Sequence, residues 1–377
     1  MKKPERIAIV HEWLTGMRGG EKCVEALCEL FPQAELFTLL HVKGSVSSTI
    51  EQMQIHTSFI QNLPFAAQRY RHYLPLFPSA IERFDLSGFD IVITSNHCVA
   101  KGVRVLSTTL HICYCYTPMR YIWGLYDEYF SKGRAGLLTR LGMKLFLKYL
   151  RQWDLRTAEN PNHFIAISEH VRQRIKDIYR RNADIIYPPV NTSFFNLSRK
   201  DDGYFLVVSA LVPYKRVDLA IEAFNTLGER LVVVGDGPDE RRLHSIAKKN
   251  IEFVGWQPDE KLREYYARCR ALIFPGEEDF GIVPLEAMAS GKPVIAYAKG
   301  GALETVIRSE NLKTGILFHQ QTAESLIDAV RKFKEEKFSA ESLRSFALTF
   351  DREVYKRRIK DCVESCWSEF QSHPAKR

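Results

Sequence analysis

Two carboxylates lie on either side of a predicted anion site. Glu278 precedes the start of a predicted helix and Glu286 lies just inside it, with seven residues between them. The unpaired N–H groups of a first helical turn favour a phosphate, and carboxylates beside it can accept hydrogen bonds from sugar hydroxyls. The helix dipole alone also favours acids at a helix start, so the spacing of the two glutamates does not by itself indicate a ligand site. The amides expected to face the phosphate belong to Phe280, Gly281, Ile282 and Val283.

A strand, a loop and a helix must hold these groups in place. Residues 271–274 are an apolar run that ends at Pro275, as a buried parallel strand would. Pro284 suits a first helical turn, because its missing N–H would have no partner there. Gly291 and the proline that soon follows it are typical of a helix end. The sequence therefore predicts that the helix start points toward the carboxyl edge of a sheet.

A longer string carries more information than the two acids. Glu-x-Phe-Gly-x-x-x-Leu-Glu-Ala-Met-Ala-x-Gly-x-Pro-Val, from Glu278 to Val294, resembles the donor-binding signature of retaining glycosyltransferases of family 4. The usual Glu-Gly-Phe-Gly is Glu-Asp-Phe-Gly here, which leaves both acids in place. The resemblance covers nearly the whole chain. It implies an α/β fold with two Rossmann-like domains facing across a cleft, the GT-B arrangement, and a C-terminal helix crossing back to the first domain.

The length and the pattern of apolar runs agree with two domains. The chain has 377 residues, enough for two cores. Strand and helix patterns alternate up to a Pro-Pro pair at 188–189 and then start again, as in doubly wound sheets. We expect an acceptor-binding domain at 1–195, a nucleotide-sugar-binding domain at 196–347 and a C-terminal helix at 348–377 that packs on the first domain.

Two cations precede a predicted helix in the second domain. Lys215 and Arg216 follow the predicted strand 204–209, where they can clamp a diphosphate. Relatives in the family usually carry an arginine where this chain has Ala210, whereas Lys215 matches. We assign catalysis to Lys215, Arg216 and Glu278. An exposed basic pair without a ligand is the alternative.

The resemblance adds further donor contacts. In the family, backbone groups after the strand that here ends near Trp256 border the nucleobase, which points to Trp256 and Gln257. Gly237 lies in a tight Gly-Asp-Gly turn after another strand and is assigned to the donor as well. The loop that contains Gly20 faces the acceptor and the donor phosphate in the family, although a tight strand-to-helix turn explains the same glycines.

The acceptor side is assigned to the first domain. His97 and Lys101 follow the predicted strand 90–95, at the end where open α/β sheets place ligands. Tyr116 and Arg120 lie in Tyr-Thr-Pro-Met-Arg-Tyr, a string that resembles an acceptor-side segment of the mannosyltransferase-like branch. That branch commonly has histidine where this chain has Tyr116. Since tyrosine is a poor base near neutral pH, we assign no general base.

Composition limits the partners. The net charge of +8 and the pI near 9.0 suit an anionic partner. We expect no nucleic acid, because no nucleic-acid-binding motif is present. We also expect no metal site, since the eight cysteines form no Cys-x-x-Cys pair and none is spaced with histidine as zinc ligands are. The cysteines are expected to be buried free thiols in a reducing cytoplasm.

One predicted helix has two interpretations. Residues 133–153 combine leucines on one side with arginines and lysines on the other. Such a helix can lie on an anionic bilayer, or it can pack on a core with its basic side in water. No leader segment and no membrane-spanning run are expected. The predicted location is the cytoplasm, with peripheral contact at the inner face of the membrane as the alternative.

These observations lead to one expected activity and several rivals. The resemblance implies a retaining, metal-independent transferase without a cofactor that moves mannose from GDP-mannose to a lipid-linked or oligosaccharide acceptor in bacterial surface polysaccharide synthesis. A UDP-sugar donor stays open, because pocket size and one or two hydrogen bonds decide such choices. The other rivals are a sugar-nucleotide epimerase and a catalytically silent nucleotide-sugar-binding protein.

Overall fold

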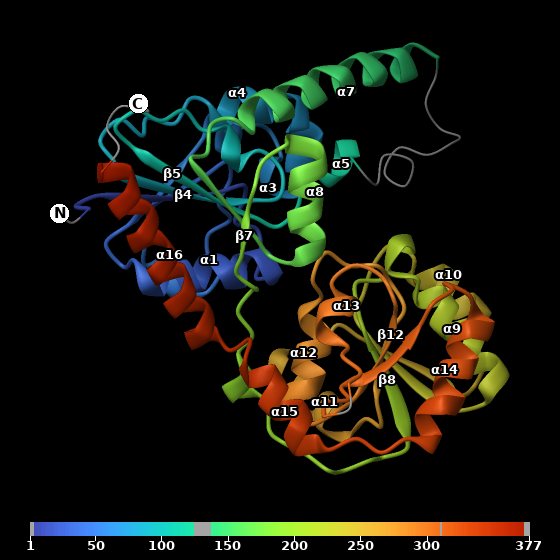
Figure 1. Cartoon of the computed structure of the whole chain (residues 1–377). Helices are drawn as coiled ribbons and strands as arrows, with labels where there is room; N and C mark the ends of the chain where they lie inside the picture. The colour runs from blue at the N-terminus through green and yellow to red at the C-terminus, as the bar shows by residue number, and fades with distance from the viewer. Residues whose placement is uncertain (1–3, 124–136, 310, 373–377) are drawn as a thin grey trace. The chain divides into compact units, whose positions relative to one another are not determined.

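The computed structural model describes residues 4–123, 137–309 and 311–372. The chain divides into two compact units. One comprises Met1–Pro189 together with Tyr355–Arg377, and the other is Val190–Val354. Each unit has a parallel sheet with helices on both faces (Figure 1). This is the doubly wound architecture that the alternating pattern predicts.

The first unit is built on a seven-stranded sheet of order β3-β2-β1-β4-β5-β6-β7. Helices α1 and α16 lie on one face, and α4 and α7 on the other (Figure 1). Its strands are β1 Ile7–His11, β2 Glu35–Thr38, β3 Gln54–Thr57, β4 Ile91–Asn96, β5 Leu110–Cys115, β6 His163–Ala166 and β7 Asp184–Ile185. Its helices, 3-10 turns (η) included, are α1 Gly19–Leu30, α2 Ser48–Glu51, η1 Phe59–Asn62, α3 Ala66–Arg69, η2 Tyr70–Leu76, α4 Phe77–Ile81, η3 Ala100–Gly102, α5 Arg120–Trp123, α7 Leu137–Thr157, α8 Glu169–Tyr179 and α16 Arg352–Ser372.

The second unit repeats the plan with a six-stranded sheet of order β10-β9-β8-β11-β12-β13. Its strands are β8 Tyr204–Val208, β9 Arg230–Val234, β10 Ile251–Gly255, β11 Leu272–Phe274, β12 Val294–Tyr297 and β13 Gly315–Phe318. Its helices are η4 Thr192–Phe194, η5 Pro213–Lys215, α9 Val217–Leu227, α10 Glu240–Ile246, α11 Asp259–Arg268, α12 Ile282–Ala289, α13 Ala302–Thr305, α14 Ala323–Glu335 and α15 Ala340–Leu348.

The central strands are apolar on both faces because helices cover both. All residues of β1, β4 and β5 are buried, as parallel strands between two helical layers must be. The edge strand β3, Gln-Ile-His-Thr, is different: its residues are exposed or half-buried. The sequence analysis placed no strand there, because an edge strand carries too few apolar residues to give a signal.

The C-terminal helix belongs to the first unit, as the resemblance implies. In α16, Tyr355, Ile359, Val363 and Trp367 recur at helical spacing and are buried. The Tyr355 ring lies 5.6 Å from the Tyr114 ring, centroid to centroid. The first and the last described segments of the chain therefore lie in the same unit.

Helix α7 can be described in part. Its observed bounds extend beyond the predicted end at residue 153, residues 133–136 lie outside the described part, and the side chains of 137–145 are not described. In the rest, Leu150 and Trp153 are buried, whereas Lys148 and Arg151 are exposed. From residue 146 onward, the helix thus packs its apolar side on the core. Among the described helices, none combines the length and apolar character needed to cross a bilayer.

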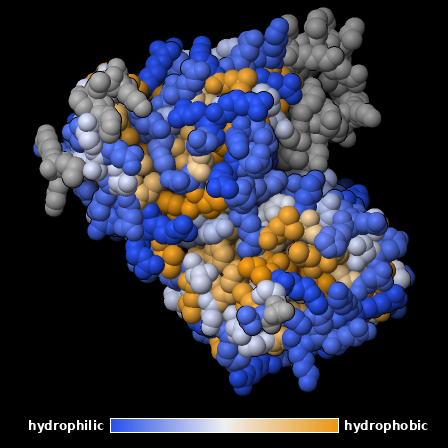
Figure 2. Space-filling model, in the orientation of Figure 1, coloured by the Kyte–Doolittle hydropathy of each residue, from blue (hydrophilic) through white to orange (hydrophobic). Residues whose placement is uncertain are grey.

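The surface is mostly polar on the side shown in Figure 2. Apolar residues gather on the second unit over α12, α13 and β12 (Figure 2). Leu303 of α13 is 55% exposed there. Since α13 follows the carboxyl end of β12, this apolar area adjoins the loops at the carboxyl edge of the second sheet.

Lys101 has a structural position, in contrast to the expected contact with an acceptor. Its side chain is fully buried, and its Nζ donates to Asp154 Oδ1 at 2.7 Å, to the Asp154 carbonyl at 2.8 Å and to Thr157 Oγ1 at 2.9 Å. Trp123 and Tyr179 donate to the other Asp154 oxygen. Three oxygen atoms accept the three hydrogens of the ammonium group, so Lys101 has no hydrogen left for the sugar acceptor.

We expect Lys101→Met to lower the free energy of unfolding of the first unit by about 3–5 kcal/mol, because it leaves the buried Asp154 carboxylate without its cation. Urea unfolding of the full chain measures the change. The control is Arg172→Ala, which breaks an ion pair with Glu169 whose side chains are 49% and 48% exposed and should cost under about 1 kcal/mol. Equal effects of the two substitutions would contradict this role for Lys101. Adding Asp154→Leu to Lys101→Met should restore part of the loss.

We expect Ile359→Ala to destabilise the first unit by about 2–5 kcal/mol, because it leaves a cavity under α16. Hydrogen exchange read by mass spectrometry should show lost protection in peptides of the first unit and unchanged protection in Val190–Val354. Lys360→Ala, at a side chain that is 59% exposed on the same helix, is the control and should change little. Equal loss of protection in both units would show that α16 is not specific to the first.

Candidate functional site

The strand order of each sheet reverses once. The reversal lies between β1 and β4 in the first unit and between β8 and β11 in the second. In open α/β sheets, ligands bind at the carboxyl ends of the strands at this point, because the following chains turn to opposite faces. The segments that leave these four strands therefore define where each unit can hold a ligand.

In the second unit, Lys215 and Glu278 meet at this point. Lys215 ends η5 after β8, and Glu278 lies in the loop between β11 and α12. The Lys215 ammonium contacts the Glu278 carboxylate, with the two side chains 20% and 14% exposed. Both residues are predicted from the sequence as ligands, but their ion pair is not. An ammonium and a carboxylate side by side can contact a phosphate and a sugar hydroxyl respectively.

Glycines let the loops after β8, β11 and β12 pack closely together around the Lys215–Glu278 pair. A Cβ on Gly276 would lie 2.9 Å from the Lys215 carbonyl oxygen. A Cβ on Gly300 would lie 2.2 Å from the Glu278 carbonyl oxygen, which also accepts a hydrogen bond of 2.8 Å from Gly301 N–H. Side chains at these glycines would displace the backbone that carries Lys215 and Glu278. The position of the pair is thus fixed by main-chain packing.

The start of α12 lies directly after Glu278. Gly281 is the N-cap residue with φ 86°, a conformation that favours glycine. The amides of Ile282 and Val283 belong to the first turn, which has no intrahelical partners for its N–H groups. Phe280 is 2% exposed, so its ring fills the core and any contact it makes with a ligand is through its backbone.

Glu286 is less accessible than the sequence suggests. It is 6% exposed on α12, and the Tyr266 hydroxyl donates to its Oε2 at 2.8 Å. Burial, and then the adjacent carboxylate, raise the pKa of Tyr266 well above its ordinary value, so the phenol stays a donor. The orientation of Glu286 is therefore fixed before any ribose arrives, and the predicted ribose contact stays a prediction.

Arg216 points to other partners than Lys215 does. Its backbone has φ 54°, and its guanidinium lies 3.3 Å from Asp218 Oδ1 and 3.1 Å from Gln321 Oε1. The side chain is 34% exposed. It remains beside the proposed site of the diphosphate, but it must exchange these partners, or share them, to bind a phosphate.

The remaining predicted donor residues lie on loops after β9 and β10. Gly237 packs against the segment after β8, since a Cβ on it would lie 2.3 Å from the Leu211 carbonyl oxygen. Trp256 is 68% exposed. Gln257 donates from its side-chain amide to the Val254 carbonyl. Trp256 is thus available to stack on a planar group, whereas Gln257 shapes its own turn.

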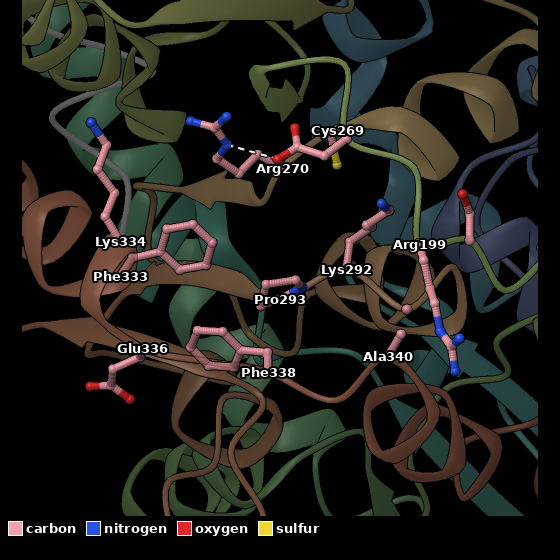
Figure 3. Close-up of a pocket in the computed structure, with 13 residues that line it drawn as sticks. Arg199, Cys269, Arg270, Lys292, Pro293, Phe333, Lys334, Glu336, Phe338 and Ala340 are labelled. Carbon is pink, nitrogen blue, oxygen red and sulfur yellow. Dashed lines mark hydrogen bonds and ion pairs between the residues drawn. The ribbon is translucent and has the colours of Figure 1, made fainter.

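A hollow of about 530 Å³ lies elsewhere in the second unit (Figure 3). Arg270 and Pro293, which line it, precede β11 and β12, so the hollow is at the amino edge of the sheet. The Arg270 guanidinium lies 3.0 Å from Asp201 and that of Arg199 pairs with Glu341. This hollow is therefore separate from the group around Lys215 and Glu278.

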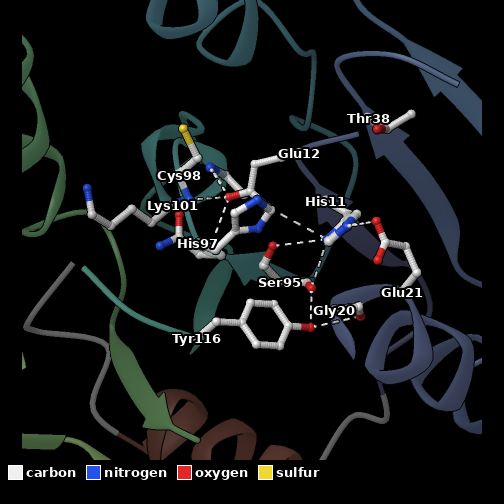
Figure 4. Close-up of polar contacts among 12 residues, drawn as sticks. His11, Glu12, Gly20, Glu21, Thr38, Ser95, His97, Cys98, Lys101 and Tyr116 are labelled. Atoms are coloured by element: carbon white, nitrogen blue, oxygen red, sulfur yellow. Dashed lines mark hydrogen bonds and ion pairs between the residues drawn. The ribbon is translucent and has the colours of Figure 1, made fainter. Parts of the chain in front are cut away.

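In the first unit, a buried polar cluster occupies the corresponding point (Figure 4). Glu12, directly after β1, is fully buried. Its Oε1 accepts the backbone N–H groups of His97 at 2.9 Å and Cys98 at 2.8 Å, and its Oε2 lies 2.9 Å from His97 Nδ1. The carboxylate thereby fixes the loop after β4 and the ring of His97, whose side chain is 29% exposed.

His11 extends this cluster toward α1. Its Nδ1 lies 3.0 Å from Ser95 Oγ, and its Nε2 lies 3.8 Å from Glu21 Oε1. Ser95 Oγ is 2.8 Å from the Tyr116 hydroxyl, which donates to the Gly20 carbonyl at 3.1 Å. The predicted residues Gly20, His97 and Tyr116 are thus brought together through groups that the sequence analysis did not assign. These are His11, Glu12, Ser95 and Glu21.

Charge interactions outweigh burial at two of these groups. Burial alone would raise the pKa of Glu12, but His97 and His11 lower it to about 2. Burial opposes a charge on His11 too, yet Glu21 and Glu12 raise its pKa above 6.5. At Tyr116, burial is the main cause and raises the pKa well above its ordinary value. Tyr116 therefore stays protonated near neutral pH and can donate a hydrogen bond. Even less of it than of free tyrosine is in the phenolate form that could act as a base.

A sequence signal for this cluster existed. His11 and Glu12 follow an apolar strand directly, and Glu21 follows a Gly-Gly pair at a helix start. Polar residues at the carboxyl end of a buried strand point to a site. The last predicted acceptor residue, Arg120, begins α5 and is half-buried.

The comparisons with known proteins agree with this geometry. Residues 191–348 match the family model described as "Glycosyl transferases group 1". The chain is 28% identical over 214 residues to the uncharacterized glycosyltransferase MJ1178 of Methanocaldococcus jannaschii, covering 54% of this chain and 60% of that protein. It is 27% identical over 164 residues to the O-antigen chain mannosyltransferase RfbU of Salmonella typhimurium, covering 40% of this chain and 46% of that one. The alignments thus span about half the length of these relatives.

Solved structures share the fold over nearly the whole chain. Anabaena Alr3699/HepE in complex with UDP aligns with a TM-score of 0.69 at 16% identity, covering 96% of this chain and all of that chain. The apo lipopolysaccharide outer core galactosyltransferase WaaB aligns with a TM-score of 0.63 at 17% identity, covering 96% and 99%. The protein therefore has the GT-B fold, and its residues 191–348 match the model of the group 1 glycosyl transferases.

Proposed function

We propose that this protein is a retaining glycosyltransferase that moves a sugar from a nucleoside diphosphate to a hydroxyl group of an acceptor. The observation that carries the proposal is the Lys215–Glu278 pair. It lies beside the start of α12, at the carboxyl edge between β8 and β11, inside the segment that matches the family. A cation, a carboxylate and the amides of a first helical turn at one place suit a sugar attached to a diphosphate.

The proposed reaction separates charge at the diphosphate. The bond between the anomeric carbon and the diphosphate oxygen breaks, and its electron pair stays on that oxygen. The acceptor oxygen forms the new bond and gives its proton to the departing diphosphate, which gains the electron pair. Lys215 and the amides of Ile282 and Val283 stabilise the negative charge that develops. Glu278 accepts hydrogen bonds from the sugar hydroxyls, which holds the anomeric carbon in place.

The remaining donor residues have supporting roles in this proposal. Arg216 adds positive charge when it shares its bonds to Asp218 and Gln321 with a phosphate. Glu286, held by Tyr266, accepts hydrogen bonds from the ribose. Trp256 offers an exposed ring to the base.

We infer mannose from GDP-mannose as the donor. Three relatives support this by name: RfbU, an alpha-1,3/1,6-mannosyltransferase of Dictyostelium discoideum, and a GDP-mannose-dependent phosphatidylinositol monomannoside mannosyltransferase of Mycobacterium tuberculosis. The string from Tyr116 to Tyr121 supports it as well. HepE, crystallised with UDP and with UDP-glucose, favours a UDP-sugar as the alternative.

The acceptor is proposed to be a lipid-linked or free saccharide that contacts the first unit. His97 is a partly exposed member of the cluster there, and the contact of its Nδ1 with Glu12 fixes the direction in which the ring can donate a hydrogen bond. A sugar hydroxyl suits such a donor. Two rivals of the proposal, an epimerase and a silent binding protein, are distinguished by incubation with donor alone and by turnover assays with acceptors.

We expect GDP and GDP-mannose to raise the melting temperature of the second unit more than UDP, ADP or their sugar conjugates do. At a nucleotide concentration of a hundred times Kd, the rise should be roughly 5–10 °C. Thermal shift of the full chain measures it. Preference for UDP would retain the fold and the site but overturn mannose, and the absence of a shift with every nucleotide would contradict the donor site.

We expect Lys215→Ala to lower kcat about 100- to 1000-fold with little change in the KM for acceptor, because the cation acts on charge that develops in the reaction. Initial-rate kinetics measure both constants. Lys299→Ala is the matched control, since Lys299 pairs with Glu277 in a neighbouring loop and is 56% exposed. Wild-type turnover by folded Lys215→Ala would exclude the proposed role.

A further inference from the structure

His163, Cys362 and Cys366 form a cluster in the first unit that the proposed activity does not use. His163 begins β6, and the two cysteines lie four residues apart on one face of α16. One imidazole nitrogen and the two sulfur atoms all lie within 4.8 Å of one another. Nearly two hundred residues of chain separate the histidine from the cysteines, so no local motif announces the cluster.

The distances in this cluster match those between the ligands of one tetrahedral ion. Zinc–sulfur bonds of about 2.3 Å place two sulfur ligands about 3.8 Å apart. Cys362 Sγ and Cys366 Sγ are 4.0 Å apart. A shift of a few tenths of an ångström, within the reach of side-chain rotation, therefore brings both thiols to bonding distance of a shared ion.

A carboxylate on the neighbouring strand lies next to His163, outside the group of three ligand atoms that are all within 4.8 Å of one another. Asp184 begins β7, and its Oδ2 lies 3.1 Å from His163 Nε2. Zinc bonds of about 2.0–2.2 Å to nitrogen and oxygen place such ligands about 3.4 Å apart. The Asp184 side chain is 71% exposed and free of core packing, so it can adjust. His163 Nε2 is buried and makes no well-aligned hydrogen bond within the described residues, despite this neighbour.

A disulfide does not account for the two cysteines. Their Cβ atoms, one helical turn apart, are about 5–6 Å from each other, whereas a disulfide needs about 3.5–4.5 Å. A metal ion bridges the longer distance without unwinding the helix. The hydrogen bond between the two thiols, followed by His163, lowers the pKa of Cys366 to about 5, whereas the same hydrogen bond raises the pKa of Cys362 well above its ordinary value. One of the two thiols therefore favours the charged form that metals bind.

We propose that His163, Cys362, Cys366 and Asp184 bind one Zn²⁺ ion, which fastens the C-terminal helix to the edge of the first sheet. Four protein ligands leave no open position, so the site is structural. Its ligands come from β6, β7 and α16, elements that are distant in sequence. Binding then stabilises the first unit alone. The proposal is independent of the donor site in the second unit.

The experiment titrates the full chain, reduced and stripped with a chelator, with Zn²⁺ and with Co²⁺. We expect one ion per chain, an absorption band from thiolate to Co²⁺, and visible bands of tetrahedral Co²⁺. At Zn²⁺ concentrations of a hundred times Kd, the melting temperature of the first unit should rise by roughly 5–10 °C. Nucleotide shifts of the second unit should not change.

Variants assign the ligands. Cys362→Ser and Cys366→Ser should each weaken Zn²⁺ binding at least 100-fold and reduce the thiolate band. Asp184→Asn, at an exposed side chain that does not disturb folding, should weaken it about tenfold. Cys28→Ala, which removes another thiol of the first unit outside the cluster, should leave binding unchanged. Lack of Zn²⁺ binding by the reduced wild-type chain, or a Co²⁺ spectrum that Cys362→Ser does not alter, would overturn the proposal.

Discussion

The reversal of strand order at one place in each sheet determines which residues can act together. Strand β8 pairs directly with β11, so the segments that follow them start side by side although 63 positions separate Lys215 from Glu278. In the first sheet, His11 pairs with Ser95 in the ladder between β1 and β4. Both polar groups described above therefore result from the same topological rule, applied once in each unit. The glycines that pack against Lys215 and Glu278 then refine a position that the sheet has already selected.

Burial decides what the charged groups at these points do. A buried charge is tolerated when partners surround it. Lys101 and Asp154 pair with each other and bond to Thr157, Trp123 and Tyr179, so this buried pair connects η3 to α7. Glu12 is just as buried, but one of its partners, His97, has a side chain that is 29% exposed. The Lys101–Asp154 pair is closed to ligands, whereas the Glu12 carboxylate holds the ring of His97, which a ligand can reach. Residue type alone does not separate these two cases.

Much of this could be predicted from the sequence, for physical reasons. Strands buried on both faces are apolar throughout, so runs such as 91–94 and 231–234 give a strong signal. The edge strand β3 gives none, since its residues are exposed or half-buried and most of them are polar. The residues of the donor motif were predicted, because a helix start after a strand limits where they lie. The Lys215–Glu278 contact and the burial of Glu286 were not predicted, because they depend on the packing of loops that the sequence does not locate.

The contacts that hold the C-terminal helix are also difficult to predict from the sequence, because they join segments that are far apart in the chain. The chain leaves the first unit after Pro189 and returns at Tyr355. Inside the second unit the two passages are joined, since Val190 N–H donates to Phe350 O and Arg352 N–H to Val190 O. These bonds fix where α16 starts but not how its far end is held. Apolar residues such as Ile359 hold the first half, and the proposed zinc ligands lie on the second. Spacing rules for zinc examine neighbouring residues, so a site assembled from two strands and the last helix escapes them until the fold is known.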